Sequence, residues 1–145
     1  MSRIGIVGPE ADKFTPFSEA RARALIRELL KPGDVVVSGK CHKGGIDKWS
    51  IEEAINLGHP YKEHPPSSHD WTHGYKPRNK LIARDSHRVV CITVRKLPPG
   101  YQGVRYPFCH HCGTADHVKS GGCWTVRFAR ELGKEADVIV IEQAP

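Results

Sequence analysis

The sequence of 145 residues has no long hydrophobic run, and none of its apolar stretches approaches the ~20 residues that a membrane-spanning helix needs. Residues 1–8 lack the basic-then-apolar order of a secretory signal peptide. The chain also lacks internal repeats and low-complexity tracts. We therefore expect one globular domain over residues 1–145, cytoplasmic and without membrane contact, with 39% hydrophobic residues to fill its core.

Two further absences concern cysteine pairs and dense basic runs. The five cysteines are an odd number, which in a cytosolic chain argues against a disulfide framework and leaves metal binding or free thiols. Lys and Arg total 22 against 16 Asp and Glu, giving a formal charge of +6, but they form no dense run. The surplus suits an anionic partner such as a nucleotide, and it gives little support to a nucleic-acid surface.

Short apolar runs alternate with segments of helical periodicity along the chain. This alternation is typical of an α/β protein whose parallel sheet is covered by helices on both faces. We expect strands at 3–7, 34–38, 59–64, 88–94 and 136–141, and helices at 17–30, 46–57, 75–85 and 123–132, with a loop at 65–73. The prediction is a Rossmann-like three-layer fold with a parallel five-stranded sheet. A Pro/Gly-rich insertion without a core of its own, containing Cys and His, occupies residues 96–120.

Three glycine-bearing loops should meet at the carboxyl edge of this sheet, where open α/β folds bind their ligands. Each loop precedes a helix start, and glycines and helix N-termini let backbone N–H groups approach an anion. Neither G-x-G-x-x-G nor G-x-x-x-x-G-K-[ST] is present, which disfavours an ordinary dehydrogenase and a P-loop NTPase. The candidate ligand-binding residues are Gly8, Pro9, Ser38, Gly39, Lys40, Gly44, Gly45, Asp47, Trp71, Arg78, Asn79, Gly121, Gly122 and Thr125.

Three of these candidates each have a second interpretation. Asp47 either bonds a ribose hydroxyl or is a helix N-cap. Arg78 either clamps a phosphate with two parallel hydrogen bonds or lies on a solvated helix face. Trp71 either stacks on a base or covers the edge of the core.

The order of the motifs resembles the SLOG superfamily of Rossmann-like nucleotide-binding proteins, in particular its small stand-alone members. The matching stretches are Val7-Gly8-Pro9-Glu10, residues 38–47, His69-Asp70-Trp71, Arg78-Asn79 and Gly121-Gly122-Cys123. The superfamily includes the LOG-type cytokinin-activating phosphoribohydrolases and the DNA-processing protein DprA, so the resemblance implies a site for a nucleotide-derived ligand. The position that carries the catalytic glutamate of LOG enzymes is occupied here by Phe128.

A cysteine and histidine cluster lies in and just after the insertion. Cys109 and Cys112 form a C-x-x-C knuckle followed by Gly113, and two thiolates at this spacing can reach one tetrahedral zinc ion. Adding His117 and Cys123 gives a Cys₃His set, which predicts a structural zinc that orders the insertion. Without H-E-x-x-H or a deaminase signature, a catalytic zinc is disfavoured. Cys91 is assigned to the core, Cys123 has the alternative of a plain turn residue, and the rivals for the fourth ligand are His110, His111, Cys41 and His42.

Three functions compete at this stage. The first is binding of a small nucleotide derivative in order to sense, sequester or process it. The second is N-glycosidic hydrolysis of a nucleoside monophosphate, with Asp47, Glu52 or Glu53 as the acid. The third is binding of single-stranded nucleic acid by the basic residues and the zinc loop. A homo-oligomer is compatible with all three.

Overall fold

The computed structural model describes residues 2–145, and within them five strands form a single parallel sheet. The strands are β1 (Arg3–Val7), β2 (Val35–Ser38), β3 (Tyr61–Glu63), β4 (Arg88–Val94) and β5 (Glu135–Ile141), in the order β3-β2-β1-β4-β5. The predicted five-stranded parallel sheet is thereby confirmed. Chain connectivity changes direction between β1 and β4, and this reversal is where open α/β sheets open a crevice for a ligand.

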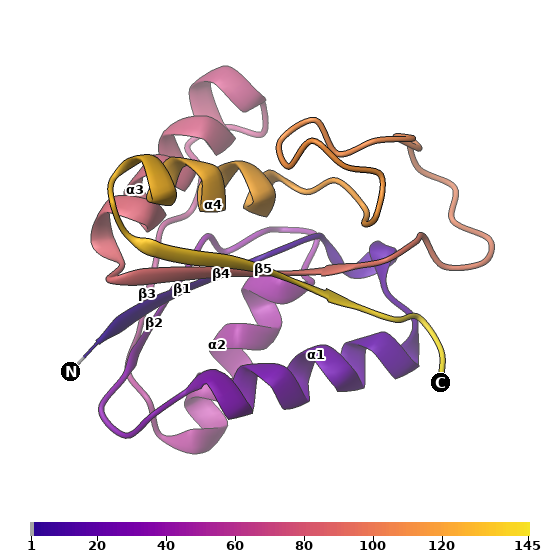
Figure 1. The fold of residues 1–145 in the computed structure, drawn as a ribbon. Coiled ribbons are helices and arrows are strands. Elements are labelled where there is room, and N and C mark those ends of the chain that lie inside the picture. Colours follow the sequence, from indigo (N-terminus) through magenta and orange to yellow (C-terminus); the bar gives the residue numbers. More distant parts are fainter. Residues whose placement is uncertain (1) are drawn as a thin grey trace.

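Helices cover both faces of the sheet, as the three-layer prediction requires (Figure 1). Helices α1 (Pro16–Leu29) and α2 (Ile46–Leu57) pack on one face, and α3 (Lys76–Asp85) and α4 (Gly121–Glu131) pack on the other. Successive strand residues alternate between the two cores, since side chains along a strand point to opposite faces. Val36 belongs to the core under α1 and α2, whereas its neighbour Val37 belongs to the core under α3 and α4.

Three segments differ from the sequence-based expectation. The strand expected at 59–64 is limited to Tyr61–Glu63, at the edge of the sheet. The expected loop 65–73 was partly wrong, because Trp71–Tyr75 form a π-helical turn that leads directly into α3. Helix α4 begins at Gly121 rather than Cys123, because the Ser120 hydroxyl caps it by accepting a hydrogen bond from the Gly122 N–H.

The insertion runs from the end of β4 to the start of α4 and lies beside the carboxyl edge of the sheet (Figure 1). Residues 96–120 form no helix and no strand. A single isolated antiparallel β-bridge in this segment pairs Cys109 with Thr114. The expectation that this segment has no core of its own stays a prediction. Among residues 2–145, no helix combines the length and apolarity needed to cross a membrane.

Candidate metal centre and ligand cleft

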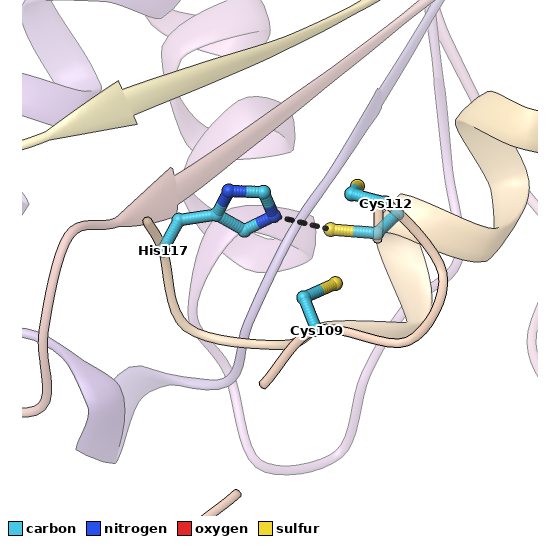
Figure 2. A group of neighbouring side chains, drawn as sticks. Cys109, Cys112 and His117 are labelled. Carbon is cyan, nitrogen blue, oxygen red and sulfur yellow. Dashed lines mark hydrogen bonds between the residues drawn. The ribbon is translucent and has the colours of Figure 1, made fainter. Parts of the chain in front are cut away.

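Four metal-ligating side chains converge where the insertion meets α4. The ligand atoms of Cys109, Cys112, His117 and Cys123 all lie within 4.8 Å of one another. Figure 2 shows the imidazole of His117 turned toward the thiols, beside the start of α4. Cys123 belongs to the first turn of α4, so the cluster ties the insertion to that helix. The alternative that Cys123 is a plain turn residue was wrong, and the rival ligands lie outside this cluster.

One pair of atoms in the cluster lies at the separation expected for two ligands of a single metal ion, for which zinc serves as the reference. With Zn–S near 2.3 Å and Zn–N near 2.0–2.1 Å, a sulfur and a nitrogen on one tetrahedral ion lie about 3.6 Å apart. The Cys123 Sγ and His117 Nε2 atoms are 3.7 Å apart. That distance is compatible with a hydrogen bond to sulfur, drawn in Figure 2, and equally with two ligands that share one ion.

The backbone and an acidic neighbour hold the ligands in place. The Cys109 N–H donates to the Thr114 carbonyl at 2.8 Å, and the Gly113 N–H donates to the Cys109 carbonyl at 2.8 Å. Gly113 has φ +73°, a conformation that glycine adopts without strain. The Nδ1 atom of His117 is 2.5 Å from the Asp116 carboxylate. A carboxylate on the far ring nitrogen is the usual second partner of a metal-bound histidine, and it directs Nε2 to the thiols.

The electrostatics of the thiols favour a cation between them. Burial first, and then the neighbouring thiols, raise the pKa of Cys112 to about 12. Burial also raises the pKa of Cys109, and the contact with Cys91 raises that of Cys123. Cys91 itself is fully buried in the core, as predicted. Cys109 and Cys123 are buried, whereas Cys112 is exposed. The raised pKa values keep the thiols protonated by themselves, and a divalent cation would supply the charge that lets them ionise.

A large cleft opens at the carboxyl edge of the sheet, between the insertion and the loops after β1 and β2. Its volume is about 1110 Å³, ample for a nucleotide-sized molecule. Among the described residues, seven Lys and Arg side chains line it against two carboxylates, those of Glu10 and Asp47. The seven are Lys13, Lys43, Arg78, Arg95, Lys96, Arg105 and Lys119. The cleft is therefore an electropositive environment.

Eight of the fourteen predicted ligand-binding residues line this cleft. They are Gly8, Pro9, Asp47, Trp71, Arg78, Asn79, Gly121 and Gly122. The other six, Ser38, Gly39, Lys40, Gly44, Gly45 and Thr125, are not among the lining residues. The hydroxyl of Ser38 donates to the Asp47 carbonyl, and that of Thr125 donates to the Gly121 carbonyl inside α4. These two hydroxyls serve the local fold instead of facing the cleft.

Glycine allows two of the predicted loops to touch. A Cβ on Gly8 would overlap the Ile92 carbonyl oxygen, and a Cβ on Gly122 would come 3.0 Å from the Gly8 backbone nitrogen. The loop after β1 and the first turn of α4 are thus in backbone contact at the base of the cleft.

Asp47 and Arg78 form a buried pair on the cleft wall. Asp47 is 5% exposed, and its Oδ2 lies 3.6 Å from the Arg78 Nη1. Burial raises the pKa of Asp47 to about 6, although Arg78 acts in the opposite direction. The N-cap alternative for Asp47 was wrong, because Gly45 occupies that position. The solvated-face alternative for Arg78 was also wrong, since it is 8% exposed.

The guanidinium of Arg78 is engaged within the protein. Its Nε donates to the Asn79 side-chain oxygen at 2.8 Å, and its Nη1 donates to the Gly39 carbonyl. A bidentate phosphate clamp pairs Nη2 with either Nη1 or Nε, so either form of the predicted clamp would involve an atom that already donates within the protein. Arg78 therefore joins the loop after β2 to α3 and shapes the cleft.

Glu53, the other candidate acid, lies outside the cleft lining. Its two carboxylate oxygens accept from Arg23 at 2.9 Å and Arg27 at 2.8 Å, both on α1. These arginines lower the pKa of Glu53 against the effect of burial. Glu52 also accepts from Arg23, at 2.7 Å. Both glutamates link α1 to α2. This role could not be predicted from the sequence, because it depends on how the two helices pack.

Sequence reasoning missed the part of the cleft that the insertion forms. Arg105, Tyr106, His110, His111 and Lys119 all line it. His110 and His111 were considered only as metal ligands, yet their positions between two knuckle cysteines turn them toward the cleft. Trp71 contacts Trp124 with ring centroids 5.4 Å apart and also borders the cleft, and its stacking on a base stays a prediction.

No protein-family model, curated protein or solved structure matches this chain.

Proposed function

We propose that this protein binds an anionic, nucleotide-type small molecule in the cleft at the carboxyl edge of its sheet. The observation that carries the proposal is the placement of a strongly basic cleft at the point where strand order reverses. The resemblance of the motifs to SLOG proteins points to the same class of ligand. Sensing, sequestering and processing of the ligand are all compatible with such a site.

The Cys₃His cluster is, in this proposal, a structural zinc site. Thiolates and an imidazole are the ligands that zinc prefers, and four protein ligands leave no open position for a substrate. The ion would hold the insertion against α4 and so fix one wall of the cleft.

Calorimetric titration with AMP and ADP-ribose tests the binding proposal. A Lys119→Gln variant removes one cation from the cleft, while Lys48→Gln removes the same charge from an exposed position of α2 outside the lining. We expect the first variant to bind roughly tenfold more weakly and the second to bind like the wild type, since a hydrogen bond to a charged group contributes about 1.5–3 kcal/mol. Absence of binding at millimolar ligand, or equal effects of the two variants, contradicts the proposal.

A second candidate function is N-glycosidic hydrolysis, and the specific observation in its favour is Asp47. A buried carboxyl group in a cleft, with its pKa raised to about 6, is poised to exchange a proton near neutral pH. Incubation with AMP and chromatographic detection of free adenine tests this role. Release of adenine that is lost in Asp47→Asn supports it, and a wild-type protein that binds AMP without releasing adenine refutes it.

A further inference from the structure

Two flat rings from different parts of the chain approach each other in the cleft. The indole of Trp71 and the imidazole of His111 have centroids 6.3 Å apart and planes inclined by 27°. Both residues line the cleft. A ring in van der Waals contact with two others needs about 3.5 Å on each side, or about 7 Å in total. The centroid separation of 6.3 Å is smaller than that, so the two side chains must move apart by about 1 Å to admit one aromatic ring.

The orientation of Trp71 is held from behind. Trp124 of α4 contacts it with ring planes at 86°, and Trp124 itself stacks on Phe128 with centroids 5.3 Å apart. Trp71 also begins the π-helical turn whose N-cap, Asp70, accepts a hydrogen bond from the backbone of His73. With this support the indole keeps 38% of its surface exposed.

The orientation of His111 is held by the metal knuckle. The residue lies between Cys109 and Cys112, whose backbone is fixed by hydrogen bonds within the knuckle. The ring of His110 packs at a centroid distance of 4.2 Å. Because contacts within the protein restrain both side chains before binding, ordering them costs little entropy when a ligand enters.

We infer that Trp71 and His111 form a stacking slot for the heteroaromatic base of the ligand. The inference rests on the proposed function and adds the ligand feature that is recognised. Stacking depends on flatness and polarisability rather than on hydrogen-bond pattern, so the slot accepts nucleotides and discriminates against sugar phosphates that lack a base. The basic side chains elsewhere in the cleft interact with the phosphate that both kinds of ligand carry.

Comparison of AMP with ribose 5-phosphate by calorimetry tests the slot, because the two probes differ in the base alone. We expect the wild type to prefer AMP by roughly 5- to 150-fold, which corresponds to the stacking energy of about 1–3 kcal/mol per base on an aromatic side chain. Trp71→Ala and His111→Ala should abolish the preference by weakening AMP binding alone. Trp71→Phe and His111→Phe keep a flat ring and should retain most of it. Metal content and thermal unfolding confirm that each variant is folded.

The outcomes separate the slot from the proposed function. Equal binding of AMP and ribose 5-phosphate to the wild type refutes the slot and leaves anion binding in the cleft intact. Binding of neither probe overturns both. An undiminished preference in Trp71→Ala assigns base recognition to other residues and refutes the slot. Trp71 lies outside the knuckle, so its variants decide the matter if His111→Ala loses metal.

Discussion

Two buried thiols on the same side of the sheet allow the metal centre to be tested against a matched control. Cys123 is 1% exposed and Cys91 is 0% exposed, and both belong to the core under α3 and α4. Cys123→Ala removes a buried sulfur and a metal ligand together. Cys91→Ala removes a sulfur of the same size from a residue outside the ligand set. Because Cys91 contacts Cys123, the control also loses packing beside the ligand, and the difference between the two variants reports the metal-ligating thiol itself.

The expected size of that difference follows from the four-ligand cluster. Loss of one buried sulfur should cost each variant about 1 kcal/mol in the free energy of unfolding. Structural zinc sites bind with about 10–16 kcal/mol, so one ligand of four contributes about 3 kcal/mol. Cys123→Ala should therefore bind zinc about 100-fold more weakly than Cys91→Ala.

Competition with a chromophoric chelator measures the two zinc affinities, and thermal unfolding with and without EDTA measures the linked stability. The wild type and Cys91→Ala should both lose stability when EDTA is added, whereas Cys123→Ala should respond much less. Equal zinc affinity in the two variants, or a melting temperature of the wild type that EDTA leaves unchanged, would refute the zinc assignment.

Three further predictions concern the sheet edge and the helices. Because burial raises the pKa of Asp47 from 3.8 to about 6, the folded state binds more protons than the unfolded state between those values, so stability falls as the pH rises through this window. Urea unfolding of the wild type and of Asp47→Asn from pH 4 to 7 measures this effect. The free energy of unfolding of the wild type should fall by up to about 3 kcal/mol relative to that of the variant. Parallel curves of this free energy against pH would contradict the prediction. Gly45→Ala should cost at least about 2 kcal/mol more than Gly33→Ala in the same assay, because both have positive φ but only a Cβ at Gly45 overlaps the Pro9 carbonyl; equal costs would refute this. Glu53→Gln should lower stability by about 1–3 kcal/mol by breaking the links to α1 while AMP binding stays unchanged, and weaker AMP binding on calorimetry would return this residue to the ligand site.

The features that sequence predicted well are those encoded over short distances. Strands such as Arg3–Val7 and Arg88–Val94 are rich in β-branched residues and are buried on both faces. Such runs can be recognised as strands without knowledge of the strands beside them. Two of the four candidate metal ligands, Cys109 and Cys112, were equally accessible, because C-x-x-C-G encodes a knuckle within five residues. The π-helical turn at Trp71–Tyr75 was missed because five residues are too few to show a helical period.

Side-chain roles in the cleft were harder to predict because they depend on partners far along the chain. The Nη1 of Arg78 donates to the Gly39 carbonyl, 39 residues away in the sequence. No residue near Arg78 in the sequence indicates this hydrogen bond. The pairing of Glu53 with Arg23 depends on how α1 packs against α2. The insertion forms one wall of the cleft, and this could not be predicted without knowing that the insertion lies against the edge of the sheet.

The short span of the metal cluster has a consequence for the order of folding. Its four ligands lie within the 15 residues from Cys109 to Cys123, whereas pairing of β1 with β4 joins residues such as Ile4 and Arg88, which are 84 apart. Loop-closure entropy grows as the logarithm of length, so the cluster costs about 1.6 kcal/mol less to close than that strand pair. The four side chains of the cluster can therefore come together before the sheet has formed.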